Sequence, residues 1–275
     1  MRLFRTRGRK GDARQLPSPP VSQAVALYKA GQYAEAEAEA RAVARSLPRA
    51  DRYAPLALSI AALATGAQGR HADAVATYDE ALPAFGRIFG VHHWQTLKLR
   101  SDRAQELAAL GRHAECEAEC AAVARTADRG AGPEMQELAA ATRNGLVFAL
   151  NGQGRHPEAE ALAREALAAH SEPDRLSLVL RLGLARSLNG QARHQEAMAE
   201  ADRADELRRG LPEEHRRPET GAVELAVATA LLGLRRGTEA RLRAAAAHDA
   251  CLASFGPDHR RTVEARVLLD RIDSA

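Results

Sequence analysis

Small and apolar residues recur along this chain at offsets of three, four and seven positions, the spacing of one face of an α-helix. A short polar segment interrupts this pattern six times. The six segments read GQYAEA, GRHADA, GRHAEC, GRHPEA, ARHQEA and RRGTEA, and they begin at positions 31, 69, 111, 154, 192 and 235. Recurrence every 38 to 43 residues indicates a repeat architecture in which each unit is one supersecondary element.

Each polar segment has the chemistry of a turn followed by the start of a helix. Its first residue, glycine in four copies, permits the backbone conformation that ends one helix. Its acidic fifth residue falls in the first turn of the next helix, where it complements the helix dipole. Each unit is therefore predicted to be a helix, a tight turn and a second helix. The flanking apolar positions keep one register, with Ala24, Ala62, Ala104, Val147, Ala185 and Ala228 before the turn and Val43, Ala81, Val123, Ala166, Ala204 and Ala247 after it.

Composition supports this helical interpretation, because apolar residues make up 45% of the chain while aromatic residues make up only 4%. Close-packed helices accept small side chains such as alanine, whereas strands favour β-branched and aromatic ones. We therefore predict an all-α protein, an α-solenoid formed by a right-handed superhelix of about six helix-turn-helix units. The segment 259–272 is expected to be a C-terminal capping helix. This domain is placed at 20–275, after a disordered basic N-terminal tail at 1–19.

The units resemble the tetratricopeptide repeat (TPR) family. The first copy follows the family pattern of small, leucine, glycine, tyrosine and proline positions at Ala24, Leu27, Gly31, Tyr33, Ala36, Val43 and Pro48. The long period resembles the kinesin-light-chain-like subclass, as do the loops at 89–96 (FGVHHWQT), 255–262 (FGPDHRRT) and, more loosely, 211–215. The resemblance covers about 20–272. It implies a scaffold that binds a protein or peptide partner in a concave groove lined by the first helix of each unit.

One family position departs from the pattern. The aromatic residue expected four places after the last residue of each polar segment occurs only as Tyr78. Smaller residues predict helices that pack more closely than usual. They are Ala40, Cys120, Ala163, Ala201 and Ala244.

Three arginines stand eleven residues before the turn in successive units: Arg100, Arg143 and Arg181. The resemblance implies that groove arginines and asparagines hold the backbone and carboxylates of an extended peptide. The chemistry fits, because guanidinium groups bind carboxylates bidentately and asparagine both donates and accepts. The alternative is that these arginines pair with acidic residues on neighbouring second helices. Candidate acids are Glu117, Glu119 and Glu160, and the other predicted groove residues are Ser101, Gln105, Asn144, Phe148, Asn151, Arg186 and Asn189.

Other candidate chemistry is better explained by structure. His113, Cys116 and Cys120 have helical spacing that suits a metal ion, but both cysteines occupy predicted core positions, so no metal is expected. His71, His113, His156 and His194 occupy one place in four of the units and indicate packing at the turn, whereas His93 and His259 in the loops are expected to be caps or braces. No phosphate-binding loop or catalytic motif is present, so we predict neither an enzyme nor a cofactor.

Charge separates the tail from the body. Residues 1–16 carry a net charge of +5, from six basic residues and Asp12, which leaves −2 for 17–275 out of the total of +3. Such a short arm gives only weak, salt-sensitive attachment to nucleic acid, so a nucleic-acid-associated regulator is an alternative to the scaffold and not the main prediction. Self-association into a homodimer is a second alternative. Three cysteines, no apolar leader and no long apolar run predict a cytoplasmic protein without a membrane span.

Overall fold

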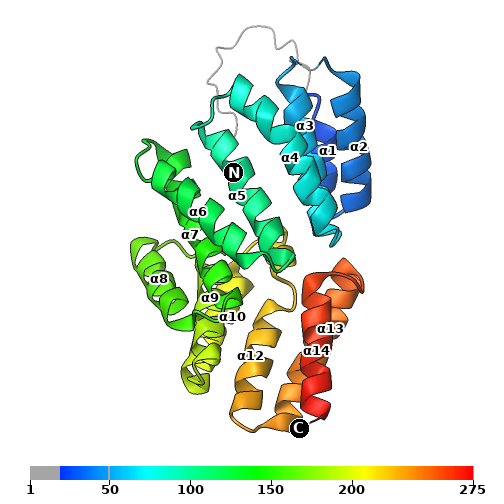
Figure 1. The fold of residues 1–275 in the computed structure, drawn as a ribbon. Helices are drawn as coiled ribbons and strands as arrows, with labels where there is room; N and C mark the ends of the chain where they lie inside the picture. Colours follow the sequence, from blue (N-terminus) through cyan, green and yellow to red (C-terminus); the bar gives the residue numbers. More distant parts are fainter. Residues whose placement is uncertain (1–18, 49, 275) are drawn as a thin grey trace, which may run out of the picture.

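Six helix pairs follow one another along the chain in the computed structural model, which describes residues 19–48 and 50–274 (Figure 1). No strand occurs in these ranges. The pairs are α1 (Ser22–Lys29) with α2 (Tyr33–Ser46), α3 (Tyr53–Ala67) with α4 (His71–Ile88), α5 (Trp94–Ala109) with α6 (His113–Ala127), α7 (Pro133–Gly152) with α8 (His156–Ala169), α9 (Arg175–Gly190) with α10 (His194–Gly210), and α12 (Ala222–Gly233) with α13 (Gly237–Phe255). The predicted α-solenoid of six units is confirmed.

A final helix, α14 (Arg260–Asp273), packs on α12 and α13, as predicted for a cap. Two short helices, α11 (Glu213–Arg216) and η1 (Arg217–Glu219), form the connection between α10 and α12. The predicted tail lies outside the described residues except for Pro19. Within the part of the chain that the structure describes, no helix is long and apolar enough to cross a membrane.

The turn between paired helices has the same backbone conformation in every unit. The glycines that open the first four turns have φ between +73° and +81°. Ala192 and Arg235 take their place in the last two units and have φ of 59° and 61°. An L-residue with a side chain rarely adopts this left-handed conformation, so these two turns are strained relative to the glycine turns. Neighbouring packing therefore overrides local preference at both positions.

Small residues form the seams between helices. The six positions before the turn, from Ala24 to Ala228, are completely buried, and so is the last residue of each polar segment. The aromatic position is equally buried whether it holds Tyr78 or a small residue such as Cys120 or Ala201. Small side chains let helix backbones approach closely, so most of the core consists of clusters that join consecutive helices.

The loops at 89–96 and 255–262 share one structure. His93 accepts a hydrogen bond at Nδ1 from the backbone N–H of Gln95, and His259 accepts one at Nδ1 from the N–H of Arg261. Each imidazole is therefore the N-cap of the following helix and is stacked on the phenylalanine that opens its loop. The predicted capping role of both histidines is confirmed.

The first helices of the pairs line the inside of the superhelix. Consecutive first helices, such as α5, α7, α9 and α12, pack on one another, whereas the second helices pack mainly on the first helices that flank them. Helices that are closer together lie on the inside of a curved stack. We call the side formed by α1, α3, α5, α7, α9 and α12 the inner face, and it corresponds to the groove expected from the sequence.

Candidate functional site

Two of the three predicted groove arginines form ion pairs with the second helix of their own unit. Arg100 of α5 donates two hydrogen bonds to Glu119 of α6, from Nε to Oε1 at 2.6 Å and from Nη2 to Oε2 at 3.1 Å. Arg181 of α9 donates from Nη1 to Oε2 of Glu200 in α10 at 2.8 Å. The partner is 19 residues further along in both cases. These bonds correspond to the pairing alternative left open by the sequence.

Arg143 is also paired, but with a different part of the fold. The residue 19 positions after it is Leu162, so its Nη2 donates instead to Oδ1 of Asp128, just after α6, at 2.8 Å. Ser101 is buried between first helices, with its hydroxyl 3.5 Å from that of Thr142 in α7. The structure therefore assigns all four side chains to contacts within the array.

The predicted asparagines join neighbouring units. Asn151 is buried near the end of α7, where its Nδ2 donates to the carbonyl of Gly183 in α9 at 3.0 Å. Its Oδ1 lies 3.0 Å from Nδ1 of His156, which donates because a carboxamide oxygen only accepts. Asn189 makes the same two bonds in the next unit. Each asparagine therefore bridges the start of its own second helix and the next first helix.

The recurring histidines pack at the turns, as predicted. Three of the four imidazoles lie against a glycine near the end of the next first helix, where no side chain fits, whereas His71 lies 2.6 Å from the carboxylate of Glu106. A Cβ added at these glycines would lie only 2.2 to 2.4 Å from ring atoms. The pairs are His113 with Gly152, His156 with Gly190, and His194 with Gly233.

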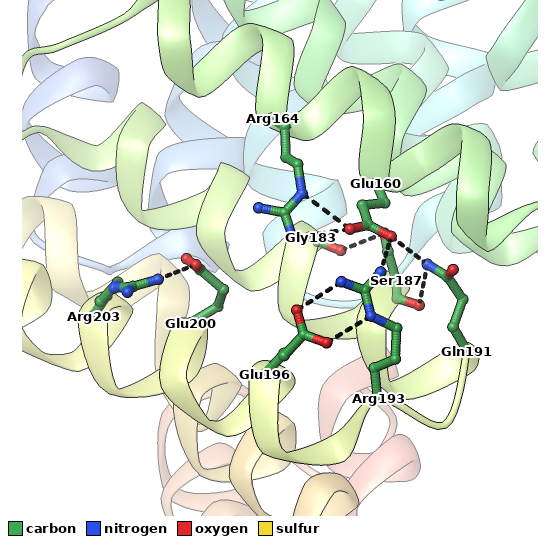
Figure 2. A network of polar contacts seen from close by, with 9 residues as sticks. All are labelled: Glu160, Arg164, Gly183, Ser187, Gln191, Arg193, Glu196, Glu200 and Arg203. Carbon is green, nitrogen blue, oxygen red and sulfur yellow. Dashed lines mark hydrogen bonds and ion pairs between the residues drawn. The ribbon is translucent and has the colours of Figure 1, made fainter.

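A second set of polar contacts joins the units near their turns. Figure 2 shows its clearest example, in which Glu160 of α8 accepts hydrogen bonds from Arg164, Gln191 and Arg193. Arg193 also binds Glu196 at the start of α10 with two bonds. Glu117 is held in the same way by the glutamine and arginine of the turn that follows α7. These acids, proposed as partners of the groove arginines, bind turn arginines instead.

Two predicted residues remain available on the inner face. Gln105 of α5 is exposed and Asn144 of α7 is half-buried. Neither makes a side-chain hydrogen bond to the described residues of the chain. Their amides can each donate and accept. They are therefore the predicted groove residues that the fold itself does not use.

Phe148 and Arg186 meet a part of the chain that the sequence did not connect with them. The guanidinium of Arg260, at the start of α14, lies 4.8 Å from the centroid of the Phe148 ring, and that of Arg186 lies 5.6 Å from it. Arg186 also forms an ion pair with Glu264 of α14. Burial lowers the pKa of Arg260 to about 10. Burial, together with the positive charges of Arg186 and Arg260, lowers the pKa of His113 nearby.

A buried carboxylate forms another contact that the sequence did not predict. Glu219 in η1 is 5% exposed and binds Arg175 of α9 at 2.6 Å and Arg261 of α14 at 3.2 Å. Burial raises the pKa of Glu219, but the two arginines outweigh this effect and hold the pKa below its ordinary value. Arg261 also donates to the carbonyls of Pro218 and Thr220. This residue set fastens the connection before α12 to both neighbouring helices.

The cysteines lie in the core, as predicted. Cys116 and Cys120 are completely buried in α6, with their sulfur atoms 3.9 Å apart, and Cys251 is completely buried in α13. Among the described residues, no group of histidine, cysteine and acidic side chains is arranged to hold a metal ion.

The sequence matches no protein-family model and no curated protein. Solved structures share the fold. A kinesin light chain from Podosopora anserina with nearly identical TPR-like repeats is 18% identical, with a TM-score of 0.54 over 68% of this chain and 92% of that one. The Rap protein complexed with Competence and Sporulation Factor is 11% identical, with a TM-score of 0.61 over 92% of this chain and 73% of that one. The repeats, the six helix pairs and these likenesses show that the chain has the α-solenoid fold of these TPR-like structures.

Proposed function

We propose that this protein is a non-catalytic scaffold that binds a peptide or protein partner on its inner face. The observation that carries the proposal is the set of side chains there that the array does not need for its own packing. Gln105 and Asn144 lie on consecutive first helices with free amides. Paired donors and acceptors of this kind suit the backbone of an extended peptide.

The comparisons support binding in general terms. The Rap protein, which shares the fold over most of this chain, is complexed with Competence and Sporulation Factor. The ion pairs of Arg100, Arg143 and Arg181 favour a recognition role for the amides over the arginines. We therefore propose Gln105 and Asn144 as the contact surface. Phe148 and Arg186 can join this surface only where α14 does not cover them.

Capture of a partner by matched variants tests this function. The tagged protein is used to retain interacting proteins, which are identified by mass spectrometry. Gln105→Ala combined with Asn144→Ala should lose a partner that the unmodified chain retains. Gln195→Ala is the control, because Gln195 is an exposed glutamine in the first turn of α10, a second helix. Equal capture by all three proteins would reject the inner face as the binding surface.

A candidate surface for self-association lies between α10, α12 and α13. Leu242 of α13 is 67% exposed beside a hollow of about 400 Å³ whose lining includes Met198, Val227 and Leu231. Exposed apolar side chains beside such a hollow are typical of association surfaces. Sedimentation velocity over a concentration series tests this candidate, because Leu242→Lys should abolish any concentration-dependent increase in sedimentation coefficient.

A further inference from the structure

The start of α14 lies against the inner face of the array, and not only against the last helix pair. Asp258 and His259 approach the turn of the second unit, where a Cβ added at Gly69 would lie 3.3 Å from the His259 Cα. The rings of His259 and His71 have centroids 6.4 Å apart. The chain therefore returns to a turn that lies 190 residues earlier in the sequence, from Gly69 to His259.

The same segment contacts the middle of the inner face. Arg260 lies over Phe148 of the fourth unit, and Glu264 pairs with Arg186 of the fifth unit. Phe148 and Arg186 are two of the residues expected to contact a partner. In this conformation both are engaged by α14, so a ligand for these side chains competes with the chain's own helix.

A further contact joins the connection before the sixth unit to the first unit. Nη1 of Arg217 in η1 donates to the carbonyl of Ala30 at 2.7 Å, and the guanidinium leaves no room for a side chain at Gly31. Figure 1 shows the result, since α13 and α14 lie close to the ends of α3 and α4. Contacts from η1 reach the first unit, and contacts from the start of α14 reach the second, fourth and fifth units.

These closing contacts are polar and partly open to solvent. The side chains of Arg186 and Glu264 are 44% and 35% exposed. Ion pairs at this exposure contribute little free energy, because water and salt screen them. By contrast, α14 is held on α12 and α13 by buried apolar residues, including Ala265 and Leu268. The contacts between α14 and the inner face can therefore break while α14 stays folded on its own hairpin.

We propose that the start of α14 covers part of the inner face in a closed state of the molecule, defined by the contacts of α14 with Phe148 and Arg186. A partner reaches these two side chains only when the closed state opens. The control of partner binding rests on the proposed function, but the closed state itself is a property of the isolated chain. Opening separates the last hairpin from the first units. It requires the loss of the Arg186–Glu264 pair, of the contact between Arg260 and Phe148, and of the approach of His259 to Gly69 and His71.

A charge reversal tests the closed state directly. Glu264→Arg places a third positive charge beside Arg186 and Arg260, and should raise the ratio of open to closed molecules about fivefold or more, the effect of losing one partly exposed ion pair. The distance is measured by energy transfer between dyes on Glu35→Cys in α2 and Leu252→Cys in α13, both exposed positions. The three native cysteines are completely buried and do not compete for dye.

Two further variants separate opening from general damage. Arg186→Glu combined with Glu264→Arg restores opposite charges and should return the dye distance to that of the unmodified chain. Asp273→Arg breaks the exposed pair of Asp273 with Arg241, which also joins α13 and α14 but does not reach the inner face. The distance should not change in this control, and far-ultraviolet circular dichroism should show the same helix content in all variants.

The outcomes are distinct for the two proposals. An unchanged distance in Glu264→Arg, or an equal change in Asp273→Arg, would overturn the closed state. If Glu264→Arg opens the chain, it should also capture about fivefold more of a limiting partner, and unchanged capture would show that α14 does not control access. Failure of every variant to capture a partner would reject the proposed function, while the dye distances would still establish the closed state.

Discussion

Replacing Gly190 by alanine tests whether the histidine–glycine contact determines how units stack. Alanine normally stabilises a helical position relative to glycine by about 0.5–1 kcal/mol, because glycine loses more backbone freedom on folding. At Gly190 the added Cβ would lie 2.3 Å from Cδ2 and Nε2 of His156. These atoms overlap, so the imidazole must move or α9 must shift away from α8.

The size of the effect follows from what holds the imidazole. His156 is fixed by its hydrogen bond to Asn151, which is itself bonded to the carbonyl of Gly183. Displacing the ring loses about 1 kcal/mol for the hydrogen bond, and overpacking adds about 1–3 kcal/mol. Subtracting the intrinsic gain of alanine leaves a net destabilisation of about 1–3 kcal/mol. The sign is therefore opposite to the one that helix propensity predicts.

Chemical denaturation of a double-mutant cycle provides the measurement. In a His156→Ala background the obstacle is gone, so Gly190→Ala should stabilise by about 0.5–1 kcal/mol. Gly210→Ala is the matched control, because Gly210 also ends a helix but has open space around its Cα, and it should stabilise the unmodified chain. Similar stabilisation by Gly190→Ala and Gly210→Ala, or a cycle without coupling, would refute the reasoning.

Three further perturbations probe other parts of the structure. Ala192→Gly should raise the unfolding midpoint by the equivalent of about 0.5–1 kcal/mol, because glycine removes the strain of φ 59° although it adds freedom to the unfolded chain; a lower midpoint would contradict this. Glu219→Gln should destabilise by about 3 kcal/mol, because it leaves Arg175 and the partly buried Arg261 without their charge partner; chemical denaturation should show a smaller loss of stability for Arg175→Gln, which leaves Glu219 paired with Arg261. Burial lowers the pKa of His259 to about 3, so this residue is neutral when folded and binds a proton more readily when unfolded. The contribution of His259 to the free energy of unfolding should be complete above about pH 6.5 and decline as the pH falls from 6.5 towards 3. The denaturation midpoint of His259→Gln should therefore depend less on acid pH than that of the unmodified chain.

Local features of the fold were predictable because the repeat expresses them in short segments. The six turns, the helix pairs and the buried seam follow from residues within one unit of about 40 positions. The capping roles of His93 and His259 were also predictable, because a cap involves only neighbouring residues. Even the strained turns at Ala192 and Arg235 lie at the positions that the repeat predicts.

The inner face was predictable as a surface but not residue by residue. Two side chains on the same helix have different roles, since Asn144 is free whereas Asn151 bridges two units. The difference depends on how far apart α7 and α9 lie, which no local pattern reports. The docking of α14 depends on the curvature summed over all units. One signal was present, because Arg260 and Arg261 occupy the first turn of a helix, where positive charge is unfavourable without a partner.

The histidine–glycine contact makes some junctions of the array interchangeable. The fourth and fifth units each offer a glycine to the preceding unit, Gly152 or Gly190, and an imidazole to the next, His156 or His194, whereas the third unit offers only the imidazole of His113 and the sixth only Gly233. A duplicated copy of the fourth or fifth unit would therefore find a matching neighbour on both sides. The junction before the third unit follows a different rule, because His71 there meets the carboxylate of Glu106 at 2.6 Å. Duplication of a unit in the middle of the chain would thus preserve its junction contacts, whereas the contact of His71 depends on the glutamate that the third unit supplies.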